Sequence, residues 1–246
     1  MSRTLARRAS AELAGTALLV AAVVGSGIAA ARLSPGDVGL QLLENAIATA
    51  LALGALILTF GPVSGAHFNP VVSAVDWWLG RRAGTGLTGS DLAAYSGAQV
   101  TGAIAGSVLA NLMFARPAAA WSGTDRTGGN LWLAEIVATA GLVLLVFALA
   151  RSGRTAVAPA AVGAYIGAAY WFTSSTSFAN PAVTIGRAFT DTFAGIAPSS
   201  VPGFVAAQLV GGLLAIAALA AWYPHAGDAA AAVVVVPHLA QETEAR

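Results

Sequence analysis

The sequence predicts an all-α membrane protein with six transmembrane helices and two shorter re-entrant half-helices, arranged as an inverted repeat. Three observations lead to this fold class. Hydrophobic residues make up 57% of the 246 residues and charged residues only 9%, whereas soluble domains carry about 25% charged residues. Several apolar segments are long enough to cross a bilayer. Three short motifs from the first half of the chain recur, in the same order, in the second half.

The six spans follow from length and hydropathy. A helix of about 20 apolar residues crosses a bilayer core. We predict one spanning helix in each of six segments: 10–31, 41–60, 92–114, 131–150, 156–172 and 203–223. Two further apolar pieces, 63–79 and 178–189, are too short to span. The first span could be a cleaved signal peptide, but its length and the presence of Glu12 favour a retained helix.

The arginines predict the topology, because basic residues favour the cytoplasmic side of a membrane. With both termini in the cytoplasm of the cell (inner) membrane, most arginines lie inside, among them Arg7, Arg8, Arg81 and Arg151. Residues 1–223 then form a single transmembrane domain, with repeats at about 10–114 and 131–223. Residues 224–246 form a cytoplasmic tail in which no motif is recognisable.

The composition excludes several functional classes. The formal net charge is +1 and no dense basic patch occurs, so no nucleic-acid partner is expected. There is no cysteine, and the three histidines are far apart, which argues against a metal centre. Catalytic side chains do not cluster within the apolar segments, and no motif for a cofactor appears. We therefore do not expect an enzyme.

The repeat consists of a glutamate, an Asn-Pro pair and a glutamine. The matched residues are Glu12 with Glu135, Asn69-Pro70 with Asn180-Pro181, and Gln99 with Gln208. Each half contains three spans, an odd number, so the second half must enter the membrane in the opposite orientation. Inverted repeats of this kind build many transporters, with the functional site near the bilayer midplane.

Each Asn-Pro pair predicts the start of a short helix, because Asn is a favoured N-cap and Pro fits the first helical position. A half-helix persists in a bilayer only where protein covers it or where it lines water. Inverted symmetry brings the two N-termini together near the midplane. Their positive dipole ends repel cations there, and the Asn69 and Asn180 amides offer N–H donors. This geometry suits a pore for neutral solutes better than two ordinary loop turns.

Glu12 and Glu135 are acidic residues within apolar helices, where a charge is costly. They either carry protons, as in a coupled transporter, or accept hydrogen bonds from the backbone of the re-entrant loops. Their symmetric placement favours structural support of the loops. Gln99 and Gln208 have the same interpretation, or act as interhelical hydrogen-bonding residues.

On these motifs, residues 10–223 resemble the aquaporin/aquaglyceroporin (major intrinsic protein) superfamily. Residues 64–71 look like the first Asn-Pro-Ala loop of that family, and residues 177–182 look like the second. The corresponding motif residues are Asn69, Pro70, Val71, Asn180, Pro181 and Ala182, with Val71 in place of the usual alanine. The resemblance implies an aquaporin-like fold, a homotetramer with one pore per subunit, and a pore-lining His67.

The resemblance also implies where a selectivity filter lies. Counting without gaps from the two asparagines gives Thr49, Ala168, Ser177 and Val183. Most members of the family have arginine at the position of Val183. With no aromatic residue, histidine or arginine among these four, the resemblance implies a wide and weakly polar filter. This pattern is similar to bacterial members associated with arsenite, As(OH)3.

Arg187 lies four residues after Val183, on the same helix face and one turn further out. It either restores positive charge at the outer mouth or bonds within its own loop, for example to Asp191. We predict a passive channel in the lipid bilayer for small neutral solutes: glycerol, water and arsenite. The alternative is a proton-coupled secondary transporter of a small solute that uses Glu12 or Glu135.

Overall fold

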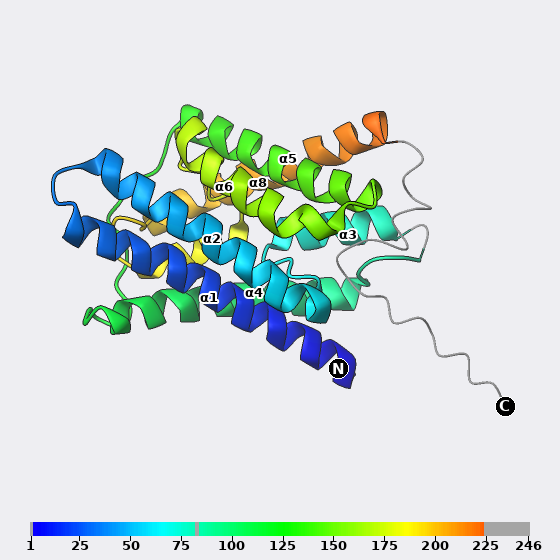
Figure 1. The fold of residues 1–246 in the computed structure, drawn as a ribbon, viewed down its shortest axis with the longest axis horizontal. Helices are drawn as coiled ribbons and strands as arrows, with labels where there is room; N and C mark the ends of the chain where they lie inside the picture. The colour runs from blue at the N-terminus through cyan, green and yellow to red at the C-terminus, as the bar shows by residue number, and fades with distance from the viewer. Residues whose placement is uncertain (1, 82–83, 224–246) are drawn as a thin grey trace.

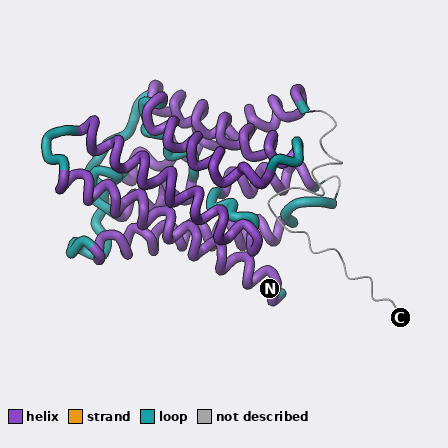
Figure 2. The backbone as a smooth tube through the Cα atoms, in the orientation of Figure 1, coloured by secondary structure: helices purple, strands orange, loops and turns teal. Residues whose placement is uncertain are grey.

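The computed structural model describes residues 2–81 and 84–223, so the predicted tail at 224–246 lies outside the described residues. Every regular element in the described part is a helix (Figure 2). The α-helices are α1 (Arg3–Leu33), α2 (Val38–Ser64), α3 (Pro70–Gly80), α4 (Gly89–Met113), α5 (Gly129–Arg151), α6 (Ala158–Phe172), α7 (Pro181–Gly186) and α8 (Val201–Trp222). Short 3-10 turns are η1 (Thr155–Val157), η2 (Arg187–Phe189) and η3 (Pro198–Ser200). Six long helices and two short ones confirm the predicted class.

The helix boundaries differ from the predicted ones mainly at the ends. α1 begins at Arg3, where the Ser2 hydroxyl accepts a hydrogen bond from the Leu5 N–H at 3.2 Å, so the basic N-terminal residues form its first turns. α2 continues through Pro62 to Ser64 and is capped by Gly65, whose φ of 90° only glycine adopts readily. The apolar piece at 63–79 therefore contains the end of α2, a loop, and most of the half-helix α3.

Five helical segments are long and apolar enough to cross a membrane: Arg3–Leu33, Val38–Ser64, Gly129–Arg151, Thr155–Phe172 and Pro198–Trp222. α4 is also long, at 25 residues, but it is more polar. Its polar side chains bond to protein: Gln99 to Glu12, and Ser107 to the Gly186 carbonyl at 2.8 Å. These two side chains are therefore buried against other elements and do not face lipid. These helices make the chain a multi-pass membrane protein.

The long helices pack side by side (Figure 1). α1 packs along α4 in the first repeat, α5 packs along α8 in the second, and α2 packs along α6 between the repeats. Glycines allow the first two contacts. A Cβ at Gly102 would lie 2.3 Å from the Leu13 carbonyl oxygen, and a Cβ at Gly211 would lie 2.6 Å from the Ile136 carbonyl oxygen. Small residues let membrane helices approach this closely.

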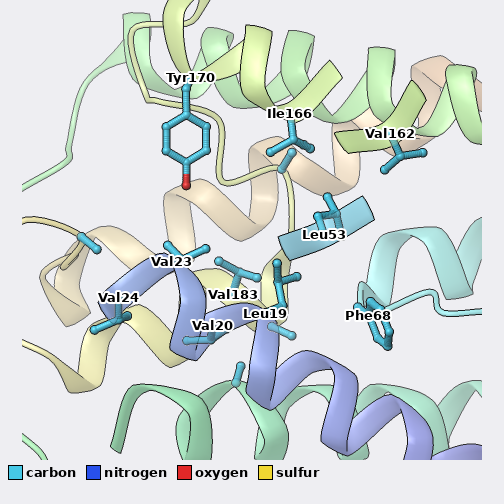
Figure 3. Close-up of a cluster of buried hydrophobic side chains, with 14 of the residues drawn as sticks. Leu19, Val20, Val23, Val24, Leu53, Phe68, Val162, Ile166, Tyr170 and Val183 are labelled. Atoms are coloured by element: carbon cyan, nitrogen blue, oxygen red, sulfur yellow. The ribbon is translucent and has the colours of Figure 1, made fainter. Parts of the chain in front are cut away.

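The two half-helices lie among the long helices. α3 contacts α4, α5 and α8, and α7 contacts α1, α4 and α8. Around them, apolar side chains from α1, α2, α6 and α7 form the largest buried cluster. Figure 3 shows Val23, Leu53, Ile166 and Val183 within this cluster, with the Tyr170 hydroxyl directed into it from α6.

Candidate functional site

The two half-helices start at the two predicted asparagines. The Asn69 side-chain oxygen accepts from the Val71 N–H at 3.0 Å, and the Asn180 oxygen accepts from the Ala182 N–H at 3.0 Å and the Val183 N–H at 3.3 Å. Pro70 and Pro181 occupy the first helical positions, where a missing N–H costs nothing. Each asparagine thus caps its own helix.

The same asparagines join the two repeats. The Asn69 amide nitrogen donates to the Ala179 carbonyl at 2.7 Å, and the Asn180 amide nitrogen donates to the Phe68 carbonyl at 2.7 Å. These reciprocal bonds hold the two helix N-termini beside each other. An amide NH2 group carries two hydrogens. Because each forms one such bond, one N–H of each asparagine remains for a group in the adjoining cavity.

The loop before each half-helix has a strained backbone. Ala66 and Phe68 have φ values of 51° and 50°, and Ser177 and Ala179 have φ values of 49° and 48°. Non-glycine residues seldom adopt this left-handed region, and each costs of order 1–3 kcal/mol unless the surroundings hold it. The strain occurs at equivalent places in both repeats, so both loops require support from neighbouring groups.

Glu12 lies under the first loop. Its carboxylate accepts hydrogen bonds from the Ser64 hydroxyl at 2.6 Å, the His67 N–H at 3.0 Å, the Phe68 N–H at 2.7 Å and the Gln99 amide at 2.7 Å. The side chain is fully buried. Its four acceptor positions are therefore occupied by protein donors.

Glu135 lies under the second loop in the same way. Its carboxylate accepts from the Ser175 hydroxyl at 2.6 Å, the Phe178 N–H at 2.8 Å, the Ala179 N–H at 2.8 Å and the Gln208 amide at 2.7 Å. It too is fully buried. The glutamates and glutamines that match between the two repeats thus form two equivalent hydrogen-bond networks.

A cavity passes both asparagines. Its wall is formed by α1, α2, α5 and α6, by both loops, and by the first turns of α3 and α7. The lining extends from Ala150 and Ala158, where α5 ends and α6 begins, to Tyr170 at the opposite end of α6. Most of the wall is apolar. The polar groups are concentrated at the asparagines and at the Tyr170 end.

Three of the four predicted filter residues line this cavity: Thr49, Ser177 and Val183. The Thr49 hydroxyl lies 3.2 Å from the Tyr170 hydroxyl. The Ser177 hydroxyl is buried, and among the described residues it has no hydrogen-bond partner. Val183 presents an apolar surface at the same site.

The prediction for Ala168 is wrong. Ala168 is exposed on the outer face of α6, as is Ala164 one turn before it. The residues of α6 that line the cavity are Ala158, Val162, Ile166 and Tyr170. Counting back from Asn180 gave the wrong helix face, and the aromatic Tyr170 occupies the place assigned to a small residue. These four residues recur at every fourth position of the sequence, and this spacing was the signal that could have revealed the cavity-facing side of α6.

Arg187 lies within the cavity wall, with a residue exposure of 2%. Its Nε donates to the Ala194 carbonyl, and its guanidinium lies 3.4 Å from the centroid of the Phe178 ring. Asp191 instead accepts from the Gly123 N–H at 3.1 Å. Arg187 therefore lines the cavity and also binds a backbone carbonyl within its own loop.

His67 lines the other half of the cavity, beside residues that the sequence did not single out. Its Nδ1 lies 3.1 Å from the Ser73 hydroxyl, and its ring meets Tyr95 edge to face at 5.6 Å. The Tyr95 hydroxyl donates to the Ser64 carbonyl at 2.7 Å and accepts from Arg8 Nε at 2.9 Å. Nothing in the local sequence marks Tyr95, because its partners come from distant segments.

No group of three or more His, Asp or Glu side chains that could hold a metal occurs in residues 2–81 and 84–223. The arrangement instead has paired half-helices, capped by asparagine, meeting beside a cavity that crosses the helical bundle. Such an arrangement defines a pore-forming membrane protein built on an inverted repeat.

Comparison with known proteins leads to the same class of protein. The model of the family described as Major intrinsic protein matches residues 1–179. The chain is 55% identical to the aquaglyceroporin AqpS of Rhizobium meliloti, over 87% of this chain and 88% of that protein. It is 32% identical to a probable aquaporin AqpM of Archaeoglobus fulgidus, over 80% of this chain and 88% of the relative.

A solved structure shares the fold. The aquaglyceroporin of Plasmodium falciparum aligns with a TM-score of 0.67 and 19% identity, covering 91% of this chain and 99% of that one. The chain belongs to the major intrinsic protein family. The predicted resemblance is therefore confirmed, and membership of this family makes the chain a channel and not an enzyme.

Proposed function

We propose that the chain is a passive channel that conducts glycerol and As(OH)3 together with water. The observation that carries this proposal is the wall of the cavity beyond the second asparagine. There the cavity passes Val183, which has no charge and no donor, beside the Thr49, Tyr170 and Ser177 hydroxyls. Hydroxyl groups both donate and accept, so they suit small neutral solutes that carry hydroxyls. The likeness to the Rhizobium meliloti aquaglyceroporin supports the same solute class.

We propose Thr49, Tyr170, Ser177 and Val183 as the selectivity filter. Tyr170 changes the expected character of this filter, because an aromatic ring and its hydroxyl replace the small side chain expected from α6. The filter is then narrower and more polar than the sequence implied, although its Val183 wall stays uncharged. Arg187 supplies positive charge at the outer mouth, where it disfavours cations.

We propose that Glu12 and Glu135 support the loops and carry no protons. Each carboxylate holds four donors, two of which are backbone N–H groups of a strained loop. A protonated carboxyl would lose acceptor capacity and leave one of these donors without a partner. The coupled-transporter alternative predicts uptake that stops when the proton gradient is collapsed, whereas the passive channel predicts unchanged uptake.

We also propose a homotetramer in the cell membrane, with both termini in the cytoplasm and one pore per subunit. Large apolar side chains on the outer faces of the bundle, such as Leu51, Leu58 and Leu213, are exposed in the single chain and suit contact with lipid or with a neighbouring subunit. Mass measurement of the protein released from membrane in native detergent tests the tetramer. Protease protection of a tag at each terminus in inverted vesicles tests the orientation.

The channel proposal is tested by light scattering and arsenic uptake in proteoliposomes. We expect wild-type protein and Val183→Ala to admit glycerol and As(OH)3 well above empty liposomes. Val183→Arg should reduce both, because the guanidinium fills the space beside Val183 and adds donors that retain the solute. Fast water flux without glycerol or As(OH)3 flux in the wild-type protein would refute the proposed solute class.

A further inference from the structure

The connection between α4 and α5 packs over the outer end of the cavity. The Ala120 N–H donates to the Phe189 carbonyl at 3.2 Å, and the Ser122 N–H donates to the Ala188 carbonyl at 3.1 Å. Further along, the Ala197 N–H donates to the Thr124 carbonyl at 2.7 Å. These bonds attach the connection to the segment that follows α7. The connection is therefore placed to act on the pore wall that this segment forms.

Arg126, in this connection, contacts both the segment that follows α7 and the loop before it. Its Nε donates to the Gly195 carbonyl at 2.9 Å, and its Nη2 lies 3.5 Å from the Phe193 carbonyl. Its guanidinium carbon lies 5.2 Å from the centroid of the Phe178 ring. Its own N–H donates to the Ser200 hydroxyl at 3.0 Å, which fixes the backbone at this point.

Arg187 contacts the same ring and a neighbouring carbonyl from the pore side. Its Nε donates to the Ala194 carbonyl, which lies between the two carbonyls bound by Arg126, and its guanidinium stacks on the same Phe178 ring. Among the described residues, its terminal nitrogens have no hydrogen-bond partner, and neither arginine forms an ion pair with a carboxylate. The Ala194 carbonyl and the face of the Phe178 ring therefore hold the Arg187 side chain against the wall.

We propose that Arg126 is a positioning residue of the outer pore, which keeps the Arg187 guanidinium against the wall and out of the lumen. It does so by fixing the 193–195 carbonyls and the Phe178 ring on which Arg187 rests. This inference rests on the proposed function as a solute channel. Arginine suits the task, because its planar fork can bind two carbonyls while its face contacts a ring.

The positioning role predicts a characteristic pattern of flux in the single and double variants. Arg126→Gln releases the carbonyls and the ring, so Arg187 enters the lumen and glycerol flux falls by about threefold, the effect of one lost hydrogen bond on an equilibrium. Arg187→Gln keeps an N–H for the Ala194 carbonyl but removes the charged end, so it provides the background in which the effect of Arg126→Gln is measured. In the double variant Arg126→Gln has nothing left to release, and flux equals that of Arg187→Gln alone.

The test is a double-variant cycle of glycerol and As(OH)3 permeability in proteoliposomes. Arg116→Gln is the matched control, because Arg116 belongs to the same connection and donates to the Asp191 carbonyl at 3.3 Å, but it is exposed and does not line the cavity. Thermal unfolding of each purified variant distinguishes a loss of folded protein from a change in the permeability of the folded channel. If Arg126→Gln does not fold, Arg126→Lys replaces it, with the same sign and a smaller effect.

Two results would overturn the proposal. The first is a flux for Arg126→Gln equal to that of Arg116→Gln. The second is an effect of Arg126→Gln that persists unchanged when Arg187 is already glutamine. A wild-type protein that passes neither solute would contradict the proposed function instead, and the same cycle would then be measured on water flux.

Discussion

Replacing Glu135 by glutamine tests the support of the second loop most sharply, because the change preserves shape and removes only charge and acceptors. Glu135 accepts four hydrogen bonds, two on each oxygen, and one bond on each oxygen comes from a backbone N–H. The glutamine NH2 group cannot accept. Whichever way the amide is oriented, either the Phe178 N–H or the Ala179 N–H loses its partner.

The size of the effect follows from these bonds. A buried N–H without a partner costs about 1–3 kcal/mol, and two remaining bonds change from charge-assisted to neutral at about 1 kcal/mol each. The fourth donor, the Ser175 hydroxyl or the Gln208 amide, can turn to accept from the new NH2 group and adds little. The sum is a loss of about 3–5 kcal/mol in the free energy of unfolding, or a fall in Tm of about 10 °C for a chain of this size. The strained φ at Ala179 adds to the need for this support.

The assay is thermal unfolding of the purified protein in detergent, together with glycerol flux in liposomes. Glu44→Gln is the control, because among the described residues the Glu44 carboxylate accepts one bond, from the Ser34 hydroxyl at 2.7 Å, and lies outside both loops. We expect Glu135→Gln to lose both stability and flux. A variant with wild-type Tm and wild-type passive flux would refute the supporting role of Glu135.

Three further predictions concern packing, the filter and the outer surface. Gly211→Val should separate α5 from α8 and leave little folded protein in gel filtration, whereas Gly97→Ala on α4, where a Cβ meets nothing, should be tolerated. Tyr170→Phe removes the hydroxyl partner of Thr49 and should change the ratio of glycerol to water flux. Ala168→Leu, on the exposed face of α6, should leave that ratio unchanged. A ratio that changes in Ala168→Leu but not in Tyr170→Phe would restore Ala168 to the filter. Hydrogen bonds from Thr127 and Ser200 hold the pKa of Asp125 below its ordinary value of 3.8, so its contribution to stability is present above that pH and is lost as the pH falls through the lowered value. Asp125→Asn should therefore flatten the acid limb of a Tm-against-pH curve, and an unchanged limb would show that Asp125 does not contribute.

Much of the fold could be predicted from the sequence, because it depends on local signals. The spans follow from apolar length, and the half-helices follow from Asn69-Pro70 and Asn180-Pro181, whose capping bonds form within three residues. Symmetry indicated that the two glutamates belong to the two loops. The exact donors could not be predicted, since they depend on how the loop backbone turns.

The residues that we propose as the filter were only partly predictable. Thr49, Ser177 and Val183 could be placed from the two asparagines, but Ala168 could not, because a turn at 173–176 separates α6 from the second loop and Thr176 has a φ of 61°. A shift of two residues on a helix moves a side chain by about 200°, to the opposite face. The contact of Arg126 with Phe178 joins residues 52 positions apart, and no periodicity reveals such a pair.

The most direct test of the central claim is the final concentration of As(OH)3 inside wild-type proteoliposomes, measured with and without a proton gradient. A passive channel predicts fast entry, a plateau equal to the outside concentration, and no effect of collapsing the gradient. Accumulation above the outside concentration that requires the gradient would contradict the account and would assign Glu12 or Glu135 to proton transfer.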